Sequence, residues 1–117
     1  MKISDSEMEI MHAVWTHNGE VTSTMIIDEL DTEWKLTTVL TFLNRLVAKG
    51  ALSRRKEGKT NYYSAAISEK EYKTQQTKSF VKEVHSGSVK NLLAALYGNE
   101  RPSSKEIEEL KEWFEEV

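Results

Sequence analysis

Four short polar side chains and one arginine recur at helical spacing between residues 36 and 49. Thr37, Thr38, Thr41, Asn44 and Arg45 fall on one side of a helix with about 3.6 residues per turn. Solvent-facing helix positions usually hold Glu or Lys, whereas threonine is a poor helix former. A threonine offers a hydroxyl to bases or phosphates and a methyl to thymine, and an arginine binds guanine O6 and N7 together. The pattern therefore favours a helix that contacts base edges in the major groove of DNA, with burial against another protein as the alternative.

Basic residues are concentrated around this helix, although the whole chain has a formal net charge of −3. Residues 1–33 contain one base and eight acids, and residues 34–63 contain seven bases and one acid. The remaining residues, 64–117, contain eight bases and ten acids. A basic segment inside an acidic chain indicates a localised surface for an anion such as phosphate, while a solvated charged face is the alternative.

Two shorter helices are predicted before the threonine-rich one. Ser4-Asp5-Ser6-Glu7 has the pattern of a capping box that starts the first helix, and Asn18-Gly19 ends it. Val21 then lies in a short extended piece, and Thr22 or Ser23 caps the second helix.

The third helix and a hairpin follow. The helix is predicted from about Leu36 to Lys49 and stops at Gly50, because glycine accepts a left-handed backbone conformation. Its expected buried side consists of Leu36, Val39, Leu43, Leu46 and Val47. Two short runs around the turn Glu57-Gly58-Lys59 predict a β-hairpin. The cations of this hairpin, some of which we expect to meet phosphates, are Arg54, Arg55, Lys56 and Lys59. Helix, short strand, helix, helix, hairpin is the order of a winged helix-turn-helix.

Residues 68–117 are predicted to form three more helices with apolar stripes. Three helices in about fifty residues cannot bury much core alone. We therefore expect the stripes to pack on a second copy of the chain, with folding back on the same chain as the alternative. The expected dimer-interface residues are Phe80, Val84, Leu92, Leu93, Leu96, Leu110, Trp113 and Phe114. The predicted protein is mainly α with a small β-hairpin, with a winged-helix DNA-binding domain over residues 1–67 and a helical dimerisation region over residues 68–117.

No group of residues points to catalysis, a metal site or a cofactor. The chain contains no cysteine, and His12, His17 and His85 form no ligand pair at useful spacing. A Gly-rich phosphate loop and a nucleophile elbow are also absent. The lack of cysteine fits a reducing compartment, and neither a membrane-length apolar run nor an apolar signal core is present. We therefore expect a cytoplasmic protein that is not an enzyme.

Taken together, these residues resemble the BlaI/MecI/CopY family of bacterial transcriptional repressors, also called penicillinase repressors. The matching stretches are Ile3–Met11 with Trp15, Trp34–Val39, Arg45–Leu52, Lys56–Lys59 and Tyr62–Ser64. The resemblance implies a homodimer with one winged helix on each half of a palindromic operator in double-stranded DNA, in a resistance or stress operon. The residues then expected to contact DNA are Lys35, Thr37, Thr38, Leu40, Thr41, Asn44, Arg45, Arg54, Arg55, Lys56 and Lys59.

The chain departs from the family pattern within the third helix. Members of the penicillinase branch tend to carry Lys at the place of Thr37 and Gln or Arg at the place of Leu40. Leu40 either packs against thymine methyls or extends the edge of the core. The resemblance therefore implies an operator that differs from the penicillinase one, bound mainly through Arg45, the threonines and the basic hairpin.

Two ways of releasing the repressor from DNA are known in the family that this sequence resembles. Copper-responsive members carry a cysteine-rich motif, which this chain lacks. Antibiotic-responsive members are cleaved at an Asn-Phe bond when a membrane sensor-protease pathway is active. That bond aligns with Ala95-Leu96, so the apolar helix persists in this chain but the scissile pair does not. Release of the repressor by such a pathway is therefore an expectation.

The alternative function is a winged-helix protein-protein interaction module that binds no operator, which the acidic flanks favour.

Overall fold

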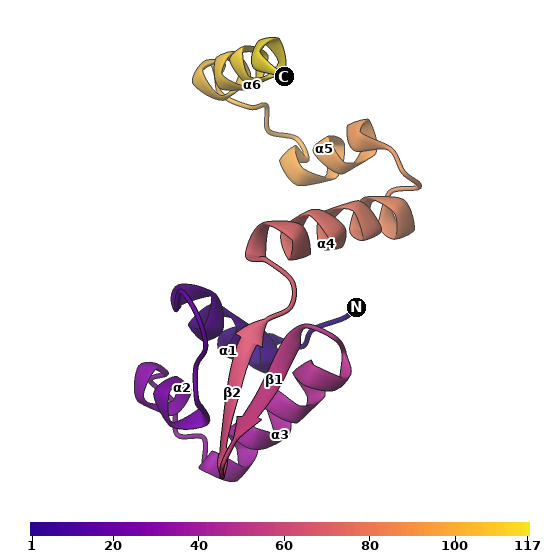
Figure 1. Ribbon diagram of the computed structural model, residues 1–117. Helices are drawn as coiled ribbons and strands as arrows, with labels where there is room; N and C mark the ends of the chain where they lie inside the picture. Colours follow the sequence, from indigo (N-terminus) through magenta and orange to yellow (C-terminus); the bar gives the residue numbers. More distant parts are fainter. The chain divides into compact units, whose positions relative to one another are not determined.

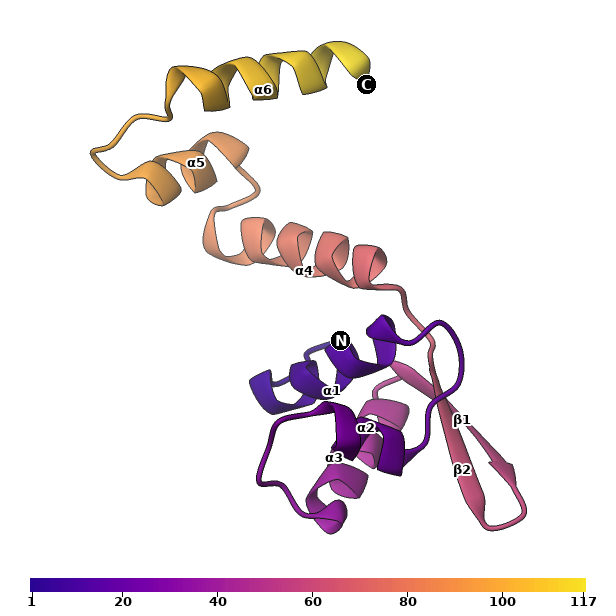
Figure 2. The ribbon, with the colours of Figure 1, turned by 90° about the vertical axis from the view of Figure 1, so that its left-hand side faces the viewer.

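The computed structural model describes all 117 residues, which form two compact units, Met1–Lys73 and Thr74–Val117. The elements in chain order are α1 (Asp5–Thr16), α2 (Ser23–Glu29), α3 (Leu36–Ala48), β1 (Leu52–Glu57), β2 (Thr60–Ala65), α4 (Glu69–Val84), α5 (Val89–Tyr97) and α6 (Ser104–Glu116). In the first unit, α1, α2 and α3 gather beside the β1–β2 hairpin (Figures 1 and 2). The predicted winged helix-turn-helix with a small hairpin is confirmed.

Side-chain caps start the helices where the sequence predicts them. The Ser4 hydroxyl accepts a hydrogen bond from the Glu7 amide at 3.2 Å, and the Glu7 carboxylate accepts one from the Ser4 amide at 2.9 Å. This reciprocal pair is the predicted capping box. Thr22 caps α2 in the same way, by accepting from the amide of Met25.

The core of the first unit lies between α1, α2, α3 and the hairpin. Ile10, Met11, Ile26, Leu43 and Tyr63 are among its fully buried side chains. The two strands are antiparallel, with register pairs that run from Leu52 with Ala65 to Glu57 with Thr60. Val21 forms an isolated bridge to Tyr63 through two backbone hydrogen bonds of 2.8 Å each, so the predicted extended piece pairs with the hairpin.

The helix α3 matches the prediction except at its first residue. Val39, Leu43 and Leu46 are buried, but Leu36 is 50% exposed and does not belong to the core. Leu36 is the first helical residue, and the ring contact near this end joins Trp34 and Phe42, whose centroids lie 5.1 Å apart. The helix ends at Ala48 with Lys49 as its cap, and Gly50 has the expected left-handed backbone with φ of +82°.

Glu7 is a buried carboxylate that joins the start of α1 to the end of α3. It is 1% exposed, and its Oε1 accepts a hydrogen bond from Lys49 Nζ. Its other oxygen, Oε2, is buried without a hydrogen-bond partner. Burial alone would raise the pKa of Glu7, but the hydrogen bonds from Lys49 and Ser4 outweigh burial and lower the pKa.

We expect the Glu7→Gln variant to be about 1–3 kcal/mol less stable at pH 7, because the charged hydrogen bonds are lost. A lowered pKa in the folded protein stabilises the fold above the unfolded pKa of about 4.3, and this contribution disappears as the pH falls through the folded pKa. The difference between wild type and variant should therefore shrink between about pH 5 and pH 3. Urea unfolding across this range measures it. Glu9→Gln, at an exposed position of the same helix, is the control. An equal difference at every pH would contradict the role of the ionised carboxylate.

The second unit contains almost no buried side chain. None of the residues of α5 or α6 is buried, and every buried hydrophobic residue of the chain lies between Ile3 and Tyr72. His85 is the one buried residue of this unit, where its Nδ1 lies 2.6 Å from Asn91 Oδ1. None of the helices of the chain is both long and apolar enough to cross a membrane.

Candidate nucleic-acid interface

The outward side of α3 presents the polar residues that the sequence places there. Thr37, Thr41, Asn44 and Arg45 are exposed, and Thr38 is partly exposed. The Thr41 hydroxyl donates to the Thr37 carbonyl at 3.0 Å. Since this bond uses the hydroxyl proton, Thr41 presents a methyl group and acceptor lone pairs to a partner.

Arg45 and Asn44 are the nitrogen donors on this side of α3. The Arg45 guanidinium lies 5.9 Å from the centre of the Phe42 ring and forms no ion pair within the chain. The Asn44 amide oxygen accepts a hydrogen bond from Arg54 Nη1 at 2.8 Å, which leaves the Asn44 NH₂ group as the free part of the amide. This bond also brings Arg54 of the hairpin beside α3, so the two predicted DNA-contacting elements meet here.

Lys35 occupies the N-cap position of α3 without a side-chain capping bond. A lysine is a poor choice here, because N-caps favour Ser, Thr, Asp and Asn and the helix dipole disfavours a cation at this end. Positions at which a local preference is broken are often functional. The exposed ammonium of Lys35 fits a role in binding an anion beside the start of α3.

The tip of the hairpin meets α3 across a groove. Lys59 and Leu40 both line this groove, which has a volume of about 380 Å³. The other lining residues are Thr22, Ser23, Thr24, Thr60, Asn61 and Tyr63. Leu40 is partly buried and packs against the core, so its side chain extends the core edge and forms one wall of the groove. The hydroxyls and amide of this groove are absent from the predicted site, because only folding brings the start of α2 beside the hairpin tip.

The strand β1 separates its cations onto two faces. Arg54 pairs in register with the buried Tyr63, and Lys56 has the same parity as Arg54 along the strand. Arg55 faces the opposite way, where its guanidinium binds Glu20 and Glu57. Arg54 and Lys56 are therefore on the α3 side of the hairpin, and Arg55 is held apart from them.

Folding neutralises two of the seven bases in the segment 34–63. Lys49 is paired with Glu7, and Arg55 is paired with Glu20 and Glu57. The five cations of this segment that form no ion pair are Lys35, Arg45, Arg54, Lys56 and Lys59. The sequence does not reveal these pairings, since Glu7 and Glu20 lie far from their partners along the chain.

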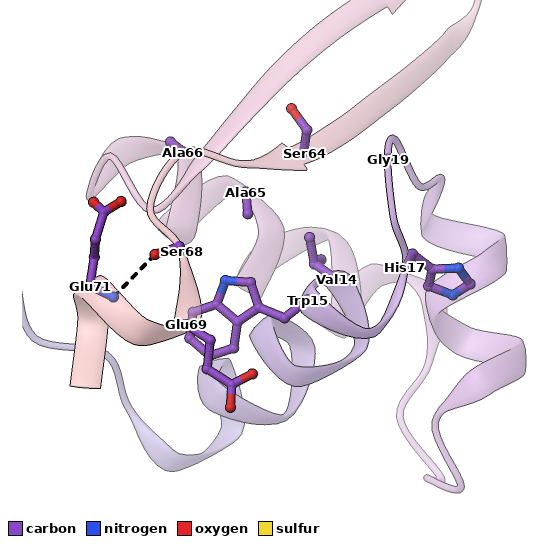
Figure 3. Close-up of a pocket in the computed structure, with 10 residues that line it drawn as sticks. All are labelled: Val14, Trp15, His17, Gly19, Ser64, Ala65, Ala66, Ser68, Glu69 and Glu71. Carbon is purple, nitrogen blue, oxygen red and sulfur yellow. Dashed lines mark hydrogen bonds between the residues drawn. The ribbon is translucent and has the colours of Figure 1, made fainter. Parts of the chain in front are cut away.

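A second hollow of about 550 Å³ lies elsewhere on the first unit, near the start of α4 (Figure 3). Trp15 is at its centre, and its indole N–H already donates to the Ile67 carbonyl at 3.0 Å. The carboxylates of Glu69 and Glu71 point in different directions (Figure 3). Glu69 is paired with Lys73. Because no polar groups converge here and the nearby charges are acidic, this hollow does not suit a phosphate.

The predicted dimer-interface side chains are uncovered in the second unit. Phe80, Val84, Leu93, Leu96, Leu110, Trp113 and Phe114 are exposed, and Leu92 is partly exposed. Val89, Ile107 and Val117 are exposed in the same unit. The predicted cleavage bond, Ala95-Leu96, lies inside α5 with both residues exposed.

Comparisons with known proteins agree with this architecture. The sequence matches the family described as "Penicillinase repressor" over residues 3–116. It is 33% identical to the penicillinase repressor of Bacillus licheniformis over 98% of this chain and 91% of that protein. It is 29% identical to the methicillin resistance regulatory protein MecI of Staphylococcus aureus, over 94% of this chain and 90% of that protein. The solution structure of monomeric B. licheniformis BlaI in complex with the blaP half-operator has a TM-score of 0.52 and 38% identity, over 62% of this chain and 89% of that one.

Proposed function

The chain belongs to the penicillinase repressor family, and we propose that this DNA-binding repressor acts as a homodimer on a palindromic operator. Its family consists of transcriptional repressors, so the protein is not an enzyme. The B. licheniformis relative was solved as a monomeric form on a half-operator, which supports one winged-helix unit on each half of the site.

The observation that carries the DNA-binding surface is the meeting of α3 with one face of the hairpin. A hydrogen bond joins Arg54 of the hairpin to Asn44 of α3, and Lys59 and Leu40 line one groove. Side chains suited to bases and cations suited to phosphates therefore lie on one surface. We propose that α3 enters the major groove and that Arg54, Lys56 and Lys59 bind the phosphate backbone. The DNA-contacting residues remain those predicted from the sequence, except that we expect Arg55 to make no direct phosphate contact because carboxylates already bind it.

The homodimer is supported by the lack of a core in the second unit. Its apolar side chains include Trp113, Phe114 and Leu96, all more than half exposed in a single chain. Apolar surface of this extent usually marks an interface, and a second copy of the chain supplies an equivalent surface. We therefore assign dimerisation to residues 68–117 and DNA binding to residues 1–67. The first turn of α4 belongs to the first unit, where Tyr72 is buried and its ring lies 5.9 Å from that of Trp15.

Release of the repressor through a membrane sensor-protease pathway stays a prediction. A protease needs an extended backbone, so cleavage at Ala95-Leu96 requires α5 to unwind locally. Cleavage there would separate α6 and the end of α5 from the rest of the proposed interface. The loss of this apolar surface would weaken the dimer and, with it, binding to two half-sites.

A titration of DNA binding against salt tests the proposed function. If the four unpaired cations other than Arg45 meet phosphates, the slope of log K against log salt on a half-operator should be about −3 to −4. A palindrome obtained by selection from random DNA should bind the protein more tightly than a scrambled duplex does at every salt concentration of the titration. An absence of binding even at low salt would contradict operator recognition and favour a protein-protein interaction module.

A further inference from the structure

Three charged residues and one aromatic ring form a cluster on the face of the hairpin that carries Arg55. The Arg55 fork donates from Nε and Nη2 to the two oxygens of Glu20, each at 2.9 Å. Its Nη1 donates to Glu57 at 2.8 Å, and its guanidinium lies 4.6 Å from the centre of the Tyr62 ring. Exposed ion pairs usually contribute little, but a bidentate fork inside a network is the geometry in which they matter.

The cluster connects the two strands of the hairpin with the extended piece at Val21. Val21 pairs with Tyr63, and Tyr63 pairs with Arg54. Because side chains alternate along a strand, the neighbouring residues Glu20, Tyr62 and Arg55 turn to the opposite face. Glu20 belongs to the loop between α1 and α2, so its contact with Arg55 ties the distal strand β1 to the helical body.

The electrostatics of this face differ from those of the α3 side of the hairpin. One guanidinium between two carboxylates gives the face a net charge of −1, which disfavours approach of a phosphate. The hydrogen bond from Arg55 lowers the pKa of Glu20, so both charges persist at neutral pH. The other face carries Arg54 and Lys56, neither of which is paired with an acid.

We propose that Glu20 is a positioning residue for the hairpin, which holds Arg55 away from DNA and thereby directs the Arg54 and Lys56 face toward the phosphates. Arg55 then supports DNA binding through Glu20 and not through a phosphate. This inference rests on the proposed function, because it assumes that the hairpin binds the phosphate backbone.

Half-operator binding by three variants across a salt series tests this role. Glu20→Gln and Arg55→Lys should each weaken binding about threefold to fivefold, since lysine keeps the charge but cannot form the fork. Their salt slopes should stay within about 0.3 of the wild type, because no phosphate contact is lost. Lys59→Gln, which removes an unpaired cation of the same hairpin, should reduce the steepness of the slope by about 0.9.

Rescue by exchange of the two charges separates positioning from direct contact. The exchange combines Glu20→Arg with Arg55→Glu, in a Glu57→Gln background that removes repulsion at the new carboxylate. It should restore affinity to within about twofold of the Glu57→Gln parent, with melting temperatures within about 2 °C throughout.

Tighter binding and a steeper slope for Glu20→Gln would overturn the inference, since they would make Arg55 a phosphate contact that Glu20 masks. Full activity of Arg55→Lys, or failure of the exchange to rescue binding in a folded protein, would overturn it as well. In those cases the proposed function would stand if Lys59→Gln still reduced the steepness of the salt slope as predicted. If neither Lys59→Gln nor Glu20→Gln changed binding, the hairpin would not contact DNA, and the proposed surface would fail together with the inference.

Discussion

Replacing Leu96 with glutamate is expected to weaken binding to a full palindromic operator by about 10²–10⁴-fold while leaving half-operator binding unchanged. Leu96 is 70% exposed within α5, so the substitution removes no packing from the single chain. In the proposed dimer it places a charge within apolar surface, and such a charge is costly to bury without a partner. When the two chains separate, binding of one chain no longer provides a high effective concentration of the other chain at the second half-site.

Sedimentation and operator titration measure the two parts of this effect. Ala94→Glu is the matched control, because it adds the same charge to α5 at an exposed position away from the apolar stripe. The control should remain a dimer and bind the full operator as the wild type does. A dimeric Leu96→Glu protein would show that α5 lies outside the interface, whereas a monomer with undiminished operator affinity would show that dimerisation does not drive binding.

Local signals in the sequence account for most of the fold. Ser4 and Thr22 cap their helices, Gly50 ends α3, and the turn around Gly58 closes the hairpin as predicted. These signals act over a few residues, so spacing and residue type are sufficient to locate them. The outward side of α3 is predictable for the same reason, since it follows from helical periodicity.

Interactions between distant residues are what the sequence does not reveal. Glu20 and Arg55 are 35 residues apart, and Glu7 and Lys49 are 42 apart. Nothing in the basic segment indicates that two of its cations are already neutralised by the acidic segment. Leu36 is a similar case, because periodicity places it on the apolar side but cannot show that the core does not reach that end of the helix.

Replacing Arg45 with alanine is expected to cost about 1–3 kcal/mol of specific operator binding, or about fivefold to 150-fold in affinity. Among the exposed residues of α3, Arg45 alone has a planar fork of donors that is free of any carboxylate. Its distance of 5.9 Å from the Phe42 ring lies within the range of a cation–π contact, which restrains the guanidinium beside the helix surface. Such a restrained fork loses less side-chain freedom when it binds guanine.

The pattern of loss distinguishes base contact from simple charge neutralisation by Arg45. In Arg45→Ala, affinity for the specific operator should fall by the full amount of about 1–3 kcal/mol, or about fivefold to 150-fold. Affinity for a scrambled duplex should fall only as much as the loss of one phosphate contact requires. Arg45→Lys should recover the scrambled-duplex affinity but not the specific affinity, because lysine cannot bind guanine O6 and N7 as a planar fork. Arg101→Ala, which removes an exposed arginine of the second unit, should change neither. If Arg45→Ala reduced both affinities equally, Arg45 would be a backbone contact, and sequence preference would have to come from the threonine side of α3 and from the shape of the DNA.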